Sequence, residues 1–271
     1  MALYRVEAIV LRSRDMGEAD RVVTLLGREG GKVRAVARGA RRPRSRLVAA
    51  TQAFTRATFS LFRGRDLDTV SQAELIDSFR GLREDLEVTA LAACAAEVTD
   101  GLLPEGEPQP DAYALLVQAF TALPAGGAAV LYGYVLKFLD VLGYRPRLDA
   151  CVSCSGELGP AGPAAPAAGA GDPDAAAPAA AASPVHFSFA QGGAVCPRCR
   201  DASAVAISRE SLEAMRRLLE TDLALAARLR LRAAAQREIE AALEGYATWR
   251  LERRLKAFEF LRLARGAGKG G

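Results

Sequence analysis

The feature that most constrains this chain is a pair of Cys-x-x-Cys motifs, Cys151-Val-Ser-Cys154 and Cys196-Pro-Arg-Cys199. A Cys-x-x-Cys turn directs two thiolates at one point, and two such turns complete the tetrahedral sulfur shell that zinc prefers. Four protein ligands leave no open position for water, so a site of this kind is structural rather than catalytic. We expect one structural Zn²⁺, bound by Cys151, Cys154, Cys196 and Cys199.

The 41 residues between the motifs exceed the roughly 15 to 20 that are usual between two such pairs. Residues 159–184, however, form a 26-residue segment with 13 Ala, 6 Pro and 4 Gly. We expect a disordered insertion there, because the prolines prevent a continuous helix and almost nothing in the segment can pack as a core. Without it the spacing is 15 residues, and a zinc ribbon-like module is expected at about residues 148–202.

Two other interpretations of the cysteines remain open. Two disulfides would need an oxidising compartment, and a thioredoxin-like redox motif would need a βαβ unit. Cys94 lies in an Ala-rich run and is expected to be a small buried hydrophobe. His186 is the only histidine. We expect it in a short strand before the second motif and not among the ligands.

Residues 1–80 show the pattern of a small β-barrel. Stretches rich in Val, Thr, Phe and Ile are separated by turn-forming residues, which predicts five strands at residues 3–12, 20–27, 31–39, 54–65 and 67–77. Five strands with no intervening βαβ helices favour an OB-type barrel. An SH3-like barrel or a half-sandwich is the alternative.

From Leu82 the hydrophobic period changes to that of a helix. Helices are expected near residues 82–101, 111–123 and 128–143, again from about Ser208, and last at 233–264. The predicted fold is therefore α+β and multidomain. An OB-type barrel (residues 1–80) precedes a helical domain (residues 81–271) that the zinc module interrupts.

Charge is unevenly distributed along the chain. The net charge is +4, but residues 1–80 hold 16 Lys and Arg against 9 Asp and Glu. The segment 28–46 alone contains eight basic residues and one acid. This asymmetry indicates a polyanionic partner for the barrel.

The segment Arg38–Arg46 follows a predicted strand and contains Gly39 and Pro43, so it is expected to be a loop that displays guanidinium groups. Forked Arg donors match phosphate oxygens and stack on bases. A merely solvated loop is the alternative. The candidate DNA-binding residues are Arg34, Arg38, Arg41, Arg42, Arg44 and Arg46. Phe54, Phe59 and Phe62 could stack on bases, but alternate aromatics in a barrel strand are more often core.

Several functions are disfavoured. The sequence has no phosphate-binding Gly motif of the Walker or dinucleotide type, and no catalytic triad or carboxylate dyad can be identified from spacing. No export signal or bilayer-spanning stretch is recognised, so a cytoplasmic protein without membrane association is expected.

Three segments resemble the recombination mediator family RecO. The first is residues 4–45, with the acidic turn of Glu18 and Asp20 and the basic Gly-Ala-Arg-Arg that follows. The second is FLDVLGYRPRLDACVSC, residues 138–154, and the third is WRLERRLKAFEFL, residues 249–261. The third segment departs from the family at Ala257, where Ser is usual, and at Trp249 and Arg250, where a His is common.

The resemblance implies binding of single- and double-stranded DNA, strand annealing and a place in the RecFOR pathway of repair and recombination. It also implies partnership with RecR and with the acidic C-terminal tail of single-strand-binding protein, leading indirectly to RecA loading at the nucleoid. Such a protein is not an enzyme. The rivals are a zinc-dependent nuclease or other nucleic-acid enzyme, and an OB-fold transcription or translation factor.

Overall fold

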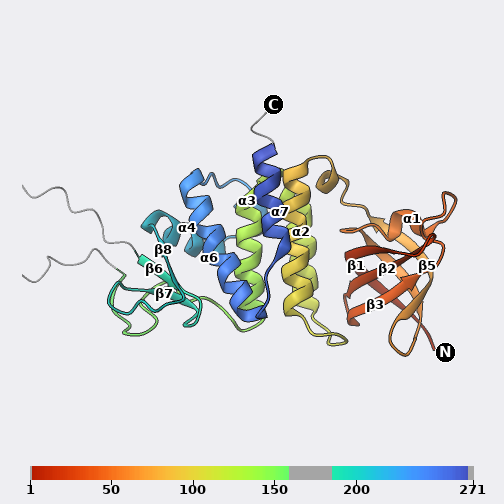
Figure 1. Cartoon of the computed structure of the whole chain (residues 1–271), viewed down its shortest axis with the longest axis horizontal. Coiled ribbons are helices and arrows are strands. Elements are labelled where there is room, and N and C mark those ends of the chain that lie inside the picture. The colour runs from red at the N-terminus through yellow and green to blue at the C-terminus, as the bar shows by residue number, and fades with distance from the viewer. Residues whose placement is uncertain (1, 159–184, 268–271) are drawn as a thin grey trace, which may run out of the picture.

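The structure, a computed structural model, describes residues 2–158 and 185–267. A β-barrel, a helical bundle and a small three-stranded sheet follow one another along the long axis of the molecule, with the bundle in the middle (Figure 1). The expected insertion at 159–184 and the last four residues lie outside the described residues.

The barrel closes in the strand order β1-β2-β3-β5-β4. β1, β2 and β3 form an antiparallel meander, β3 runs parallel to β5, and β4 is antiparallel to both β5 and β1. This closed five-stranded barrel confirms the predicted OB-type fold. The strands are β1 (Leu3–Met16), β2 (Asp20–Gly27), β3 (Gly31–Ala37), β4 (Arg56–Phe62) and β5 (Asp68–Asp77), and a short helix α1 (Leu47–Ala50) precedes β4.

The barrel core follows from strand alternation. In β4 the side chains of Ala57, Phe59 and Leu61 are fully buried, whereas the intervening Thr58 and Ser60 are partly exposed. Successive side chains of a strand point to opposite faces, so one face of β4 fills the barrel. Phe59 is thus a core residue, as its alternation predicts.

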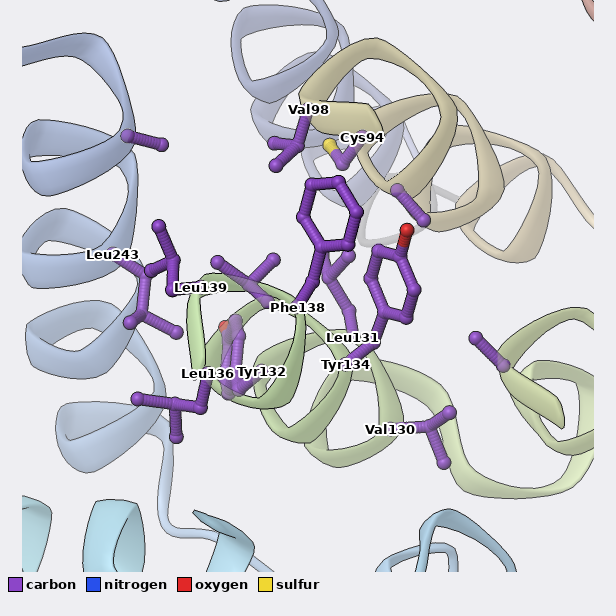
Figure 2. Packing of buried hydrophobic residues seen from close by; sticks show 14 of the residues in the cluster. Cys94, Val98, Val130, Leu131, Tyr132, Tyr134, Leu136, Phe138, Leu139 and Leu243 are labelled. Atoms are coloured by element: carbon purple, nitrogen blue, oxygen red, sulfur yellow. The ribbon is translucent and has the colours of Figure 1, made fainter. Parts of the chain in front are cut away.

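The helical bundle is built around α3. Its elements are η1 (Arg80–Arg83), α2 (Leu86–Leu102), α3 (Pro110–Val141), α4 (Arg209–Glu220), α5 (Leu223–Ala226), α6 (Ala233–Leu251) and α7 (Lys256–Ala267). Figure 2 shows residues of α3 packed between α2 and α6. Phe138 stacks on Tyr134 with ring centroids 5.5 Å apart. Cys94 is fully buried in this core, which confirms its interpretation as a small hydrophobe.

The sequence predicts the break within α3 but not the one between α6 and α7. α3 contains a non-helical residue, Gly127, so it consists of two helical segments, as the pattern around Pro124 predicts. The single last helix expected at 233–264 is wrong, because Glu252 adopts a left-handed conformation (φ 53°) and ends α6. The chain then turns and begins α7 at Lys256.

α3 is also the helix of the described residues that is long and apolar enough to cross a membrane by length and composition. Half of its most apolar window is buried inside the protein. Core helices pass the same test, and α3 packs against α2, α4 and α6.

The third part is a sheet of order β7-β6-β8, formed by β6 (Val185–Ser188), β7 (Gly193–Val195) and β8 (Ala204–Ile207). Its Phe187 packs edge-on against Tyr246 of α6, with centroids 5.6 Å apart. A Cβ at Gly245 would lie 2.1 Å from the Phe189 ring, so glycine is required for the sheet to pack this closely on α6.

Buried polar contacts join the barrel to the bundle. Lys32 of β3 is only 9% exposed and forms an ion pair with Asp100 of α2, with Nζ and Oδ1 3.3 Å apart. Glu7 of β1 accepts hydrogen bonds from Tyr113 of α3 (2.8 Å) and from Arg56. Although burial opposes the shift, these two hydrogen bonds lower the pKa of the Glu7 carboxyl.

We predict that Asp100→Ala destabilises the protein by about 3–5 kcal/mol, because it removes the carboxylate that neutralises the buried Lys32 ammonium. Urea unfolding would measure the change. The control is Glu84→Ala, which removes the exposed ion pair with Arg80 and should cost less than about 1 kcal/mol. Equal losses in the two variants would contradict the prediction.

Candidate metal centre and nucleic-acid interface

The four predicted ligands meet at one point. The sulfur atoms of Cys151, Cys154, Cys196 and Cys199 all lie within 4.8 Å of one another, and those of Cys154 and Cys196 are 4.0 Å apart. A tetrahedral zinc ion bound at about 2.3 Å per sulfur places its ligands about 3.8 Å apart. All five cysteines of the chain are free thiols. The sulfur geometry therefore fits one metal ion, and no disulfide joins these cysteines in the structure.

Backbone hydrogen bonds shape both turns. The N–H of Ser155 donates to the Cys151 carbonyl (2.9 Å), and that of Cys199 donates to the Cys196 carbonyl (3.0 Å). The N–H of Cys196 also donates to the Cys151 sulfur at 3.4 Å. The second Cys-x-x-Cys turn is thus hydrogen-bonded to the first, although 41 residues separate the two motifs in the sequence.

The pKa values of Cys151 and Cys199 are shifted in opposite directions from the value of an ordinary thiol. Burial alone would raise the pKa of Cys151, but hydrogen bonds from the backbone N–H groups of Cys154 and Cys196 outweigh it and lower the pKa to about 6. Hydrogen bonding within the cluster, first to Cys196 and then to Cys154, raises the pKa of Cys199 to about 12. Successive thiolates repel one another, and a divalent cation would remove that penalty.

Two polar residues beside the cluster were not identified from the sequence. Gln191 hydrogen-bonds with Ser153 of the first turn and donates to the Cys199 carbonyl (3.4 Å) and to Asp201 (2.8 Å). Asp201 also accepts hydrogen bonds from Ser188 and Ser203, which lower its pKa to about 2. Gln191 and Asp201 thus tie the two turns to β6. Neither residue type nor spacing signals this role in the sequence.

His186 lies in β6, as predicted, and is 7% exposed. Desolvation by burial, followed by the charge of Arg200, lowers its pKa. The group of side chains that could hold a metal consists of the four cysteines and does not include His186.

The basic loop, residues 38–46, connects β3 to α1. Asp20 accepts a hydrogen bond from the Gly39 N–H (2.7 Å), which fixes the start of the loop to the β1–β2 turn. Gly39 needs its left-handed conformation, φ 66°, to make this turn. The candidate side chains Arg34, Arg38, Arg41, Arg42, Arg44 and Arg46 are all exposed.

The structure divides the basic residues into two groups. Arg41 forms an ion pair with Asp15 (3.2 Å) and donates to the Gly17 carbonyl (2.9 Å), so it anchors the loop. Lys32 is buried against Asp100 and does not lie on the surface. Among the described residues, the other five candidate arginines have no acidic partner within ion-pair distance.

The three phenylalanines take different places. Phe59 fills the barrel, and Phe54 packs edge-on against Phe120 of α3 at 5.6 Å. Phe62 is 37% exposed. The core interpretation is thus confirmed for Phe54 and Phe59.

Comparison with known proteins places the chain in a family. Residues 1–79 match the model "Recombination protein O N terminal", and residues 83–258 match "Recombination protein O C terminal". The chain belongs to the RecO family. It is 44% identical over 98% of its length to the DNA repair protein RecO of Symbiobacterium thermophilum, all of which is covered. It is 39% identical over 96% of its length to the DNA repair protein RecO of Pelotomaculum thermopropionicum, of which 94% is covered.

Membership in the RecO family assigns the protein to DNA repair and recombination. The two family models meet between residues 79 and 83, after β5 and before α2. The RecO resemblance read from residues 4–45, 138–154 and 249–261 is confirmed.

We predict that Cys196→Ser lowers the zinc content from about one ion per chain to near zero and destabilises the β6–β8 sheet, because metal binding energy at such a site is folding energy. Metal analysis of protein purified without added zinc gives the stoichiometry. Cys94→Ala, which removes a sulfur from the bundle core, should keep its zinc. Wild-type protein without metal would contradict the assignment.

We predict that Asp201→Ala speeds the transfer of zinc to a chelator and costs about 1–3 kcal/mol, because the buried Ser188 hydroxyl and the Gln191 amide lose their acceptor. Chelator kinetics and urea unfolding would measure both effects. Asp149→Ala is a suitable control, since Asp149 is an exposed carboxylate next to the first turn. Identical transfer rates in the two variants would exclude a supporting role for Asp201.

Proposed function

We propose that this RecO protein binds single- and double-stranded DNA on the basic loop and anneals complementary strands without covalent chemistry. The observation that carries the proposal is the set of exposed arginines without acidic partners, Arg34, Arg38, Arg42, Arg44 and Arg46, on an OB-type barrel. A surface whose arginines are not neutralised internally attracts phosphates over several ångströms.

Annealing follows from charge neutralisation. Two complementary strands repel each other through their phosphates, and guanidinium groups that bind both strands lower that repulsion. Phosphate contacts position a strand without reading its bases, so the bases stay available for pairing. Anchoring of the loop by Asp20 and Arg41 supports this role, because it fixes the backbone that carries the remaining arginines.

We propose that the metal is one Zn²⁺ with a structural role and that the protein is not an enzyme. Four sulfur ligands would leave no coordination position for a water nucleophile. This argues against the nuclease alternative. The support for zinc is the donor set, since thiolates in a tetrahedral arrangement select zinc over the oxygen-preferring Mg²⁺ and Ca²⁺.

The proposed partners come from the family. With RecR, the protein would help to load RecA onto strands covered by single-strand-binding protein, whose acidic C-terminal tail it would contact. The nucleoid would be its place of action.

The proposed function is tested by annealing. Pure protein at stoichiometric amounts should accelerate pairing of two complementary oligonucleotides in the presence of EDTA kept too dilute to remove the bound zinc, and without any nucleotide. A gel or fluorescence-quenching assay measures the rate. Acceleration that requires Mg²⁺ or ATP, or strand cleavage, would favour the enzyme alternative.

We predict that Arg42→Ala/Arg44→Ala weakens single-strand binding at every sequence and flattens the slope of log K against log salt by about 1.4, since each phosphate contact contributes about −0.7. Fluorescence anisotropy of a labelled dT oligonucleotide at several salt concentrations gives the slope. The control is Arg228→Ala/Arg230→Ala, which removes two exposed arginines between α5 and α6. The same slope in both variants would show that the basic loop is only a solvated surface.

A further inference from the structure

The end of α6, the residues that follow it and the start of α7, together residues 249–256 and here named the α6–α7 turn, combine an exposed aromatic ring with several cations. Trp249 is the only tryptophan of the chain and is 51% exposed. It is not among the partly buried hydrophobic residues that pack against the core. Within seven positions after it the chain has one acid, Glu252, and four basic residues, Arg250, Arg253, Arg254 and Lys256.

One of the four cations, Arg250, has partners inside the protein. Arg250 lies over the rings of Tyr144 and Tyr246, at 4.6 and 5.1 Å from their centroids, and donates to the Tyr246 hydroxyl at 3.0 Å. Arg253 approaches Gly101 at the C-terminal end of α2, where a helix dipole favours a positive charge.

Arg254 and Lys256 differ from Arg250 in that no such contact with an aromatic ring or hydroxyl is found for them among the described residues. Both are exposed, and neither forms an ion pair with any described acid. The nearby Glu97 is engaged by the backbone N–H of Ala257 at 2.7 Å. Two positive charges therefore face solvent within seven positions of the exposed indole in the sequence.

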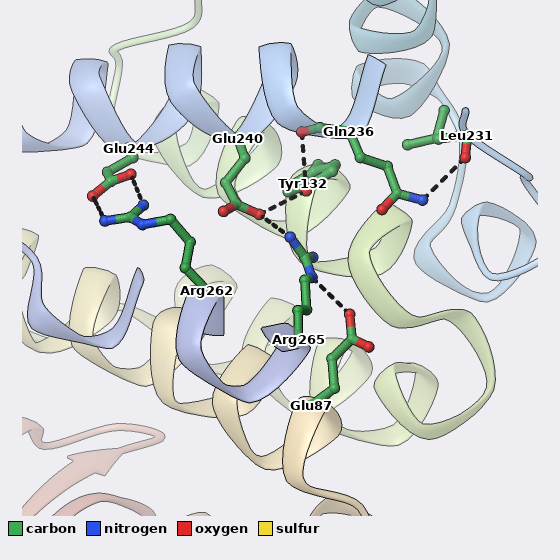
Figure 3. A network of polar contacts seen from close by, with 8 residues as sticks. All are labelled: Glu87, Tyr132, Leu231, Gln236, Glu240, Glu244, Arg262 and Arg265. Atoms are coloured by element: carbon green, nitrogen blue, oxygen red, sulfur yellow. Dashed lines mark hydrogen bonds and ion pairs between the residues drawn. The ribbon is translucent and has the colours of Figure 1, made fainter. Parts of the chain in front are cut away.

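Later arginines of α7, unlike Arg254 and Lys256, are paired with glutamates. Arg262 pairs with Glu244 (2.6 Å), and Arg265 bridges Glu240 (2.7 Å) and Glu87 (2.8 Å) (Figure 3). These ion pairs neutralise the later arginines and hold α7 against α6 and α2. The turn that precedes them is thus fixed in place while its own charges remain available.

The first turn of α7 lies beside the barrel. Ala257 lines a pocket of about 240 Å³ together with Arg12 and Arg14 of β1 and Glu97 of α2. Arg14 is exposed and adjoins Asp15, which anchors Arg41 of the basic loop. One exposed cation, Arg14, therefore lies between the anchor of the basic loop and the start of α7.

We propose that the α6–α7 turn is a second contact site for single-stranded DNA, in which a base stacks on Trp249 while Arg254 and Lys256 bind the neighbouring phosphates. This inference rests on the proposed DNA binding of the barrel and extends the same strand across the junction. Single-strand sites combine cationic grooves with aromatic platforms because every base presents a π-face. A duplex hides those faces, so the site discriminates in favour of single strands.

The single tryptophan makes the site directly observable. Titration with an unlabelled dT oligonucleotide should quench Trp249 fluorescence in a saturable way, and the midpoint should match the binding curve from anisotropy of the same labelled oligonucleotide. A duplex of equal length should bind with little quenching. Free N-acetyltryptophanamide controls for absorption by the DNA.

The outcomes separate the inference from the proposed function. Binding by anisotropy without any change in fluorescence overturns the second site and leaves the barrel site intact. No binding by anisotropy overturns both. Quenching by an acidic peptide such as oligoglutamate, but not by dT, would assign the turn to a protein partner and overturn the proposal.

Variants test the two parts of the site by anisotropy. Trp249→Ala should weaken dT binding about tenfold and duplex binding little, whereas Trp249→Phe should keep most of the affinity because a stacking ring remains. Arg254→Ala/Lys256→Ala should flatten the salt slope by about 1.4, and the control Arg228→Ala/Arg230→Ala should leave it unchanged. Unchanged zinc content and melting temperature show that the variants fold. Equal weakening of dT and duplex binding by Trp249→Ala would overturn the stacking role.

Discussion

The buried ion pair between Lys32 and Asp100 is the interaction on which the arrangement of the two halves depends. It joins β3 to the last turn of α2, and Asp100 also binds Arg12 of β1 at 3.1 Å. Removing two charges from water is expensive, so the geometry persists only when the barrel sits at one place on the bundle. Gly31 reinforces this, because a Cβ there would lie 2.3 Å from the Glu107 carbonyl oxygen. The barrel surface and the C-terminal end of α2 are thereby held in a fixed relation.

This constraint explains why local patterns predicted the elements but not their connection. Alternation in β4 and turn residues such as the Gly30-Gly31 pair specify the barrel, because strand period is a local property. The left-handed Glu252 that separates α6 from α7 has no such signal, since glutamate favours helix and Trp249 to Leu261 continue a helical pattern. Packing of α7 on α2 and α6 decides that boundary, and this packing involves residues more than 100 positions apart in the sequence.

The cysteine cluster was predictable for a different reason. Two Cys-x-x-Cys turns carry their geometry within four residues each, so the ligands follow from the sequence even across 41 intervening residues. Gln191 and Asp201 could not be found in this way. Their roles depend on the Ser153 hydroxyl and the Ser188 hydroxyl being brought together by folding, and glutamine and aspartate between strands are otherwise ordinary loop residues. The cysteines can be recognised in the sequence from their type and spacing, whereas the residues that hydrogen-bond around them can be recognised only from contacts in the folded chain.

The same distinction applies to the charges. Counting arginines and lysines in the sequence treats Lys32, Arg41 and Arg42 alike, but the structure buries the first, ties the second to Asp15 and leaves the third without an acidic partner among the described residues. In α7, Arg262 and Arg265 are likewise neutralised by glutamates. What remains after internal pairing is the charge that a polyanion can use, since a guanidinium already bound to a carboxylate must give up that partner before it binds a phosphate. Cations without an acidic partner among the described residues remain at several places, and these include the basic loop, Arg14 and the α6–α7 turn. In the proposed binding mode, one extended strand would contact both the basic loop of the barrel and the α6–α7 turn of the helical domain.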